Sequence, residues 1–138
     1  MPLVIALSIV GALLLFLFYA FAHEKPPAPA DVAIAYERAW DLLDFSMLFD
    51  LSGAELRDGM RRDAFIAAKR AAYTRQDQHR IGATIEIDTA VVGNDTALVV
   101  TRVVTGEGAV RNNVLLERRG GSWVVVEYTL RPDPADRV

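Results

Sequence analysis

"GSWVVVEYTL", residues 121–130, decides how the C-terminal half of this chain folds. Its β-branched and aromatic residues favour a strand, and successive side chains of a strand point to opposite faces. Trp123 and Val125 then lie on one face, and Val124 and Val126 lie on the other. Because both faces are apolar, the sequence predicts a strand that is covered on each side.

Three more strand-like segments precede this one, and each is followed by a glycine-containing turn signal. They are "ATIEIDTAVV" (83–92) before "GND", "TALVVTRVVT" (96–105) before "GEG", and "AVRNNVLLERR" (109–119) before "GG". Short turns between alternating runs indicate hairpins. We therefore expect a four-stranded antiparallel meander, with Ile85, Ile87, Thr89 and Val91 on one face of its first strand.

Helical spacing dominates the residues before the strands. "VAIAYERAWDLLDFSMLFD" (32–50) has apolar residues at helical intervals, with Asp31 as its N-cap, and predicts one long helix or two helices broken near residues 44–46. "SGAE" (52–55) has capping-box spacing and predicts a short helix that ends near Gly59. A third helix is expected over "RDAFIAAKRAAYTR" (62–75), capped by Asp63, and a loop over "QDQHR" (76–80).

A long apolar segment opens the chain. "LVIALSIVGALLLFLFYAFA" (3–22) contains no charged residue and has the length that a helix needs to cross a bilayer, which predicts a transmembrane anchor over residues 1–22. A cleaved signal peptide is the alternative, because "AFA" (20–22) has the small-x-small form of a cleavage site. The apolar run is longer than a usual signal core and no Lys or Arg precedes it, which favours a retained single-pass anchor in the cell membrane.

A proline-rich linker, residues 23–30, separates this segment from a domain predicted over residues 31–131, and residues 132–138 read as a polar tail. Lys25 follows the apolar run and no basic residue precedes it, so the positive-inside rule leans toward a cytoplasmic domain. Glu24 weakens this asymmetry, and small domains on proline-rich stems often face outward. The side of the membrane therefore stays open.

Composition excludes several classes of function. The 138 residues carry 15 Lys and Arg against 18 Asp and Glu, with both signs interspersed, which gives no basic stripe for nucleic acid. The chain has no cysteine, so disulfides, cysteine nucleophiles and thiolate metal sites are ruled out. His23 and His79 lack partners at metal-ligand spacing. We expect no metal and no cofactor.

The order of elements resembles that of the nuclear-transport-factor-2-like superfamily, whose members have a cone-shaped, cystatin-like α+β fold. The resemblance covers residues 31–131 and depends on stretches such as "AYERAWDLLDF" and "GGSWVVVEYTL". It is closest to small membrane-anchored bacterial members of unassigned function. It implies three helices packed on a curved sheet, with a pocket between them, and it implies no particular activity because this fold serves many functions.

A two-residue "GG" hairpin would place Val114 opposite Glu127 and Asn112 opposite Thr129. Glu127 would then be the one acidic residue on an apolar face. It is the only candidate for a catalytic residue, as a general base, and the support for it is weak. A solvated position at the end of the sheet explains it equally well, so we expect no catalysis. The candidate residues of the pocket are Trp40, Tyr36, Asn112, Glu127 and Thr101.

The other face of the predicted sheet is also apolar and has no cover within the chain. Such a face marks an association surface more often than chance exposure. Its candidate residues are Leu98, Val100, Arg102, Arg111, Asn113, Leu115, Val124, Val126 and Tyr128. We therefore expect a non-catalytic, membrane-anchored interaction module, an accessory component that docks on a membrane-protein complex or on itself. The alternatives are binding of a small apolar ligand or lipid in the pocket, and an isomerase- or dehydratase-like enzyme.

Overall fold

The computed structural model describes residues 2–23, 25–73 and 84–132. The elements are α1 (Pro2–Ala22), α2 (Pro29–Leu42), α3 (Phe45–Leu51), the 3-10 helix η1 (Ala54–Leu56), α4 (Arg62–Ala72), β1 (Thr84–Val92), β2 (Thr96–Thr105), β3 (Gly108–Arg119) and β4 (Ser122–Pro132). The α+β class and the four-stranded antiparallel sheet are as predicted. The predicted loop at 76–80 and residues 133–138 of the predicted tail lie outside the described residues, and Pro132, the first residue of that tail, ends β4 instead.

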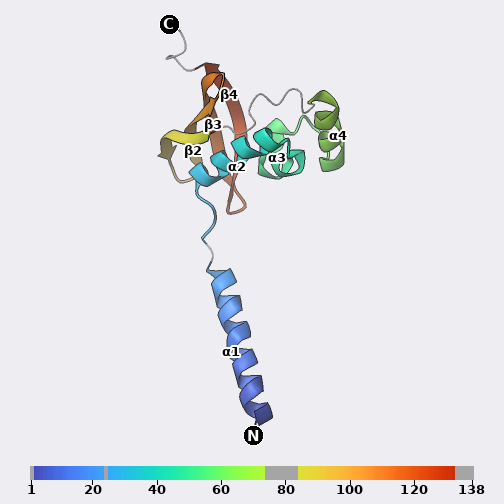
Figure 1. The fold of residues 1–138 in the computed structure, drawn as a ribbon, viewed down its shortest axis with the longest axis vertical. Helices are drawn as coiled ribbons and strands as arrows, with labels where there is room; N and C mark the ends of the chain where they lie inside the picture. The colour runs from blue at the N-terminus through green and yellow to red at the C-terminus, as the bar shows by residue number, and fades with distance from the viewer. Residues whose placement is uncertain (1, 24, 74–83, 133–138) are drawn as a thin grey trace.

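Helix α1 projects away from the rest of the molecule and is joined to it by an extended segment (Figure 1). The side chains described along it are exposed, among them Leu13, Leu14 and Phe16. Over the part of the chain that the structure describes, no helix is both long enough and apolar enough to span a membrane. The helix predicted over this segment is present as α1. Its passage through a bilayer stays a prediction.

The sheet has the order β1-β2-β3-β4, with each strand antiparallel to its neighbour. A bulge between Ile87 and Thr89 interrupts the pairing of β1 with β2. The extra residue reverses the side-chain alternation. Ile85 and Ile87 face the helices, whereas Thr89 and Val91 face away, so the single shared face predicted for these four residues is wrong.

A second bulge, at Val126, changes the pairing of β3 with β4. The predicted register holds from Arg119↔Ser122 to Leu116↔Val125, and beyond it Leu115 pairs with Glu127 and Val114 with Tyr128. A shift of one residue moves every later side chain to the opposite face. Tyr128 therefore points toward the helices and Glu127 points away from them, the reverse of the prediction.

The helical region follows the prediction except at its boundaries. Helix α2 begins at Pro29, and Asp31 is its third residue, accepting a hydrogen bond from the Ala28 N–H at 3.2 Å. Pro suits this first position because it lacks the N–H that a helix start leaves unpaired. Leu43 adopts a left-handed conformation, with φ 51°, and separates α2 from α3. The break thus consists of Leu43 and Asp44 and overlaps the start of the predicted range 44–46.

Besides Asp31, two further predicted N-caps are wrong. The Ser52 hydroxyl does not cap a new helix, because it donates to the Leu48 carbonyl oxygen at 2.6 Å, and Gly53 precedes η1 instead. Helix α4 follows Arg61, which places Asp63 in its first turn. A carboxylate there still favours the helix, through the partial positive charge at its start.

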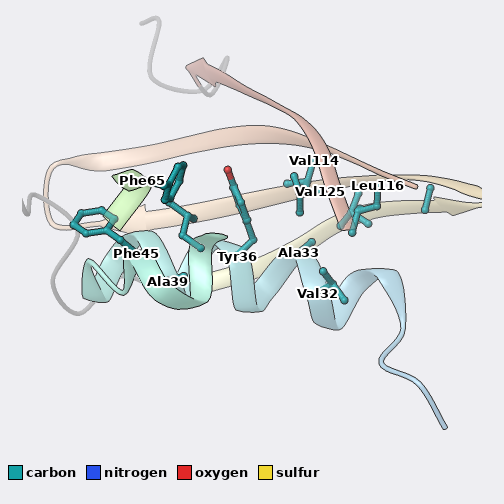
Figure 2. Close-up of a cluster of buried hydrophobic side chains, with 12 residues drawn as sticks. Val32, Ala33, Tyr36, Ala39, Phe45, Phe65, Val114, Leu116 and Val125 are labelled. Atoms are coloured by element: carbon teal, nitrogen blue, oxygen red, sulfur yellow. The ribbon is translucent and has the colours of Figure 1, made fainter. Parts of the chain in front are cut away.

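Helix α2 lies across the inner face of the sheet, the face toward the helices, and contacts β1, β2 and β4. Figure 2 shows Tyr36 pointing from α2 toward the strands. Phe65 and Phe45 lie farther along, in the direction in which α2 runs. The buried core joins these side chains to others of the helices and of the sheet: Val32, Ala33 and Ala39 of α2, Leu48 of α3, and Ala97, Val99, Val114, Leu116 and Val125 at alternate strand positions. Helix α4 packs on α3 at the side of the molecule (Figure 1).

The segment after α3 covers part of the free edge of β4. The Gly53 N–H donates to the Val125 carbonyl oxygen at 2.7 Å, and Ser52 forms a parallel bridge with Val125. Two ionic hydrogen bonds join Glu55 to the Arg119 guanidinium at the end of β3, one of them 2.9 Å long. This segment satisfies backbone groups that an uncovered edge strand would leave open.

Candidate functional site

A buried carboxylate joins α2 to three strands of the sheet. Glu37 has no solvent exposure. Its Oε1 accepts hydrogen bonds from Thr101 Oγ1 at 2.7 Å and from Asn112 Nδ2 at 2.8 Å, and its Oε2 accepts one from the Tyr128 hydroxyl at 2.8 Å. Asn112 Nδ2 also donates to the Tyr128 hydroxyl at 2.9 Å. These four residues form the Glu37 network.

The sequence analysis did not identify Glu37. In "AYERAWD" an acidic residue beside Arg38 looks like part of a solvated helix face. Its position in the helix does indicate that it is buried. Ala33 precedes it by four residues and Trp40 follows it by three, so all three lie on one face of the helix. A charged residue on the apolar face of a helix needs partners in the core.

A small pocket lies beside the network, and Tyr128 belongs to both. Its volume is about 180 Å³. It lies between α2, α3, α4 and the turn after η1, and we call it the aromatic pocket; its lining residues are Tyr36, Trp40, Leu48, Leu56, Asp58, Phe65, Lys69 and Tyr128. Burial raises the pKa of the Tyr36 phenol, so this wall stays neutral.

The aromatic pocket carries few polar groups that a ligand can reach. The Tyr128 hydroxyl proton is directed to Glu37, and the carboxylate lies behind it with no exposed surface. Asp58 and Lys69 supply the charged groups, and Lys69 Nζ lies 3.6 Å from Asp58 Oδ2. A ligand in the aromatic pocket therefore meets ring faces and aliphatic side chains together with the Asp58–Lys69 ion pair.

Four of the five residues predicted to line a pocket do lie close together. Tyr36 and Trp40 line the aromatic pocket, while Thr101 and Asn112 belong to the Glu37 network. Glu127 does not join them. The bulge at Val126 turns its side chain to the outer face, where it is exposed and accepts a 3.4 Å hydrogen bond from the Thr129 hydroxyl.

The predicted association surface is partly assembled. The pairing places seven of its nine residues on the outer face, the face away from the helices: Leu98, Val100, Arg102, Arg111, Asn113, Leu115 and Val124. Val126 lies at the bulge and is buried against Gly53, and Tyr128 is on the inner face. The prediction that both belong to the outer face is wrong, because it did not include the bulge.

Ion pairs cross the outer face. Arg102 Nη1 lies 3.7 Å from Glu86 Oε2, and Arg111 Nε lies 3.6 Å from Asp88 Oδ2. The two arginines, expected to reach acidic groups of a partner, thus already have acidic neighbours within the sheet.

Within the described ranges, no group of three or more His, Asp or Glu side chains is arranged to hold a metal ion.

Solved structures of low sequence identity are similar to this chain in fold. A nuclear-transport-factor-2-like protein of unknown function from Silicibacter pomeroyi shares 19% identity, and the match covers 74% of this chain and 90% of that one, with a TM-score of 0.54. A protein of unknown function with a cystatin-like fold from Nostoc punctiforme shares 17% identity over 80% of this chain and 96% of that one, with a TM-score of 0.52.

No family model matches the chain, and no curated protein matches it. At 19% and 17% sequence identity, these matches show a shared fold and do not show a shared function. The domain after α1 therefore has the nuclear-transport-factor-2-like, cystatin-like fold, as the resemblance implied.

Proposed function

We propose that this chain is a non-catalytic, membrane-tethered binding module that holds a small, largely apolar ligand in the aromatic pocket. The observation that carries this proposal is the lining itself, in which the rings of Tyr36, Trp40, Phe65 and Tyr128 surround a cavity of about 180 Å³. Ligand sites are usually concave and aromatic, with few polar groups. The volume is below the ~300–1,000 Å³ of typical ligand pockets, which favours a ligand of few atoms.

The Glu37 network supports a binding role over a catalytic one. A general base must come within hydrogen-bond reach of the proton that it removes. Glu37 has no exposed surface, and both of its carboxylate oxygens accept hydrogen bonds from side chains of the sheet. A molecule in the aromatic pocket would meet the Tyr128 ring first.

Fluorobenzene is a suitable apolar probe, and fluorine NMR can follow its binding to the full chain in mild detergent. We expect the native chain to shift and broaden the probe signal, and Leu56→Trp to abolish this effect because the larger side chain fills the aromatic pocket. Leu42→Trp is the matched control, since Leu42 is 67% exposed and lies outside that pocket. An equal response from the native chain and Leu56→Trp would exclude the aromatic pocket as the binding site.

Residues 3–22 support the membrane tether. They contain no charged residue, and the described side chains of α1 are exposed and mostly apolar. Exposed apolar surface of this kind is costly in water and favourable in lipid. The proposed orientation has the domain in the cytoplasm, on the basic side of the segment.

The absence of cysteine makes the orientation testable. A single cysteine introduced as Asn94→Cys lies in the exposed β1–β2 turn, and a thiol reagent that cannot cross membranes would label it in intact cells only if the domain faces outward. We expect labelling only after the cells are opened. Labelling of intact cells would reverse the proposed orientation.

Self-association through the outer face is a second candidate function. Val91 is 70% and Leu98 39% exposed there, and with Leu115 they line a shallow groove of about 290 Å³. Side chains of both charge signs lie on the same face, and a two-fold interface pairs such a face with its own copy. Leu98→Lys should convert a dimer into a monomer in sedimentation of the full chain in micelles. A monomeric native chain would exclude self-association, and crosslinking in native membranes would then test docking on another membrane protein.

A further inference from the structure

The Lys69 side chain occupies a cage of aromatic rings at the rim of the aromatic pocket. Its ammonium group lies 5.3 Å from the ring centre of Phe65, 5.8 Å from that of Trp40 and 5.9 Å from that of Tyr73. The Asp58 carboxylate completes the cage at 3.6 Å. Aromatic faces carry negative potential and attract cations at these distances.

The cage is built from separate parts of the chain. Phe65 lies one turn before Lys69 and shares its side of α4, Tyr73 is the extended residue that directly follows α4, and Trp40 comes from α2. Edge-to-face contacts brace the rings, with 5.2 Å between the centres of Trp40 and Tyr73. Asp58 lies in the turn after η1 with a left-handed φ of 53°, a conformation that an L-residue adopts only at some cost.

We propose that the ligand of the aromatic pocket is a small organic cation, such as a quaternary ammonium, and that Lys69 is its intramolecular competitor. This inference rests on the proposed function and names its ligand class. Trp40, Phe65, Asp58 and Lys69 all line the aromatic pocket, so an incoming cation meets the rings and the carboxylate that Lys69 now occupies.

Charge and reach favour a cation over an anion. An anionic ligand could pair with Lys69, but it would face the Asp58 carboxylate and the negative faces of three rings. A cation that replaces Lys69 keeps every one of these contacts. Lysine can leave without any movement of α4, because its four-carbon stem turns freely and carries the charge to solvent.

Three probes of one shape separate the alternatives: choline is cationic, 3,3-dimethylbutanol is neutral, and 3,3-dimethylbutanoate is anionic. Binding to the full chain in mild detergent can be followed by Trp40 fluorescence once Trp123, the only other tryptophan, is replaced by Phe. In that background, Lys69→Ala removes the competitor and should tighten choline binding about 3- to 30-fold, the range that cation–π energies correspond to. Arg70→Ala is the matched control, since it removes an exposed positive charge from the same helix and should leave the affinity unchanged.

Asp58→Asn tests the carboxylate. Asparagine tolerates the left-handed conformation of this position, so the fold is retained, and the affinity for choline should fall about 2- to 5-fold. Thermal unfolding of each variant checks that the domain remains folded. The proposal is supported if Lys69→Ala binds choline more tightly than the neutral probe and Asp58→Asn weakens this preference.

Equal binding of choline and the neutral probe to Lys69→Ala would overturn the cation proposal, as would tighter binding of the anion or no binding of any probe. The fluorobenzene result is independent of these outcomes. If fluorobenzene binds the native chain and Leu56→Trp abolishes its binding, the aromatic pocket remains a binding site while the cationic ligand class is rejected.

Discussion

Glu37 shows how one side chain fixes the position of a helix on a sheet. Its carboxylate accepts hydrogen bonds from Thr101 on β2, Asn112 on β3 and Tyr128 on β4. Burying a carboxylate costs free energy that only such partners offset. A displacement of α2 by one turn would leave the carboxylate and its donors unpaired, so the Glu37 network selects a single arrangement.

The Tyr128 hydroxyl is the member of the network that can be removed with the least change in shape. Tyr128→Phe deletes the donor to Glu37 Oε2 and should lower the free energy of unfolding by about 1.5–3 kcal/mol, as for other hydrogen bonds to charged groups. Urea unfolding followed by circular dichroism measures this loss. Tyr73→Phe is the control, because this side chain is 39% exposed, and it should change stability by less than about 0.5 kcal/mol. Equal effects of the two substitutions would show that the network hydrogen bond contributes no more than a surface hydroxyl.

The sequence predicted part of this site. Tyr36, Trp40, Thr101 and Asn112 were identified because they lie on predicted inner faces, and they do gather around the network and the aromatic pocket. Glu37 could not be recognised from its neighbours in sequence, since its partners are 64, 75 and 91 residues away. Only the register of the sheet shows that three donors converge on it.

At the scale of elements, the segment 52–56 holds the edge of β4 to the end of α3. An exposed ion pair between Glu55 and Arg119 also joins this segment to the end of β3. Hydrogen bonding to the Arg119 guanidinium holds the pKa of the Glu55 carboxyl near 2, below its ordinary value of 4.5. The same contact, with a further one from Glu117, raises the pKa of Arg119.

This pair predicts a specific pH dependence. Because the pKa of Glu55 is lower in the folded chain than in the unfolded chain, its contribution to stability is fully present above about pH 4.5 and is lost as the pH falls toward about 2. The unfolding temperature of the native chain should therefore fall more steeply over this range than that of Arg119→Met. Arg118→Met, which removes an exposed charge next to it, should retain the native slope. Parallel curves for all three proteins would show that the pair does not stabilise the fold.

Gly53 gives this segment the room to approach β4. A Cβ at this position would lie 2.6 Å from Glu55 Oε2 and 3.1 Å from Val126 Cγ1. Gly53→Ala should therefore turn the flexible end of Glu55 aside and crowd Val126, and lower the free energy of unfolding by about 1 kcal/mol, the low end of the cost of overpacking. Gly106→Ala is the control because a Cβ there meets no atom within 4 Å. If chemical denaturation finds the two variants equally stable, the close approach at Gly53 is not restrictive.

The elements themselves follow from periodicity, and the errors come from single inserted residues. The "GG" turn fixes the pairing of β3 with β4 as far as Leu116↔Val125, as predicted. The bulge at Val126 has no sequence signal, because "VVV" contains neither Gly nor Pro. It lies where the covering segment meets β4, and Val126 is buried there beside Gly53. That one residue decides whether Tyr128 or Glu127 faces the helices.

At the scale of the whole molecule, the chain divides into an isolated helix and a self-contained domain. The buried core runs from Val32 to Val125 and includes no residue of α1. Helix α1 ends on its own hydrogen bonds, with the His23 N–H directed to the carbonyl oxygens of Tyr19 and Ala20. The domain thus has a complete core without the apolar segment that precedes it.

Removal of residues 1–24 should therefore leave the domain intact and change only where the chain is found. We expect the shortened chain to unfold at the same urea concentration as the full chain, within about 0.5 kcal/mol, and to remain in the supernatant after an alkaline wash of membranes that retain the full chain. Leu14→Arg is the control within the full chain: a charge at the centre of an inserted helix costs about 2.5–3.5 kcal/mol, so retention should fall while the domain keeps its stability. A less stable shortened chain would make α1 part of the fold, and retention of all three proteins would place the membrane contact on the domain.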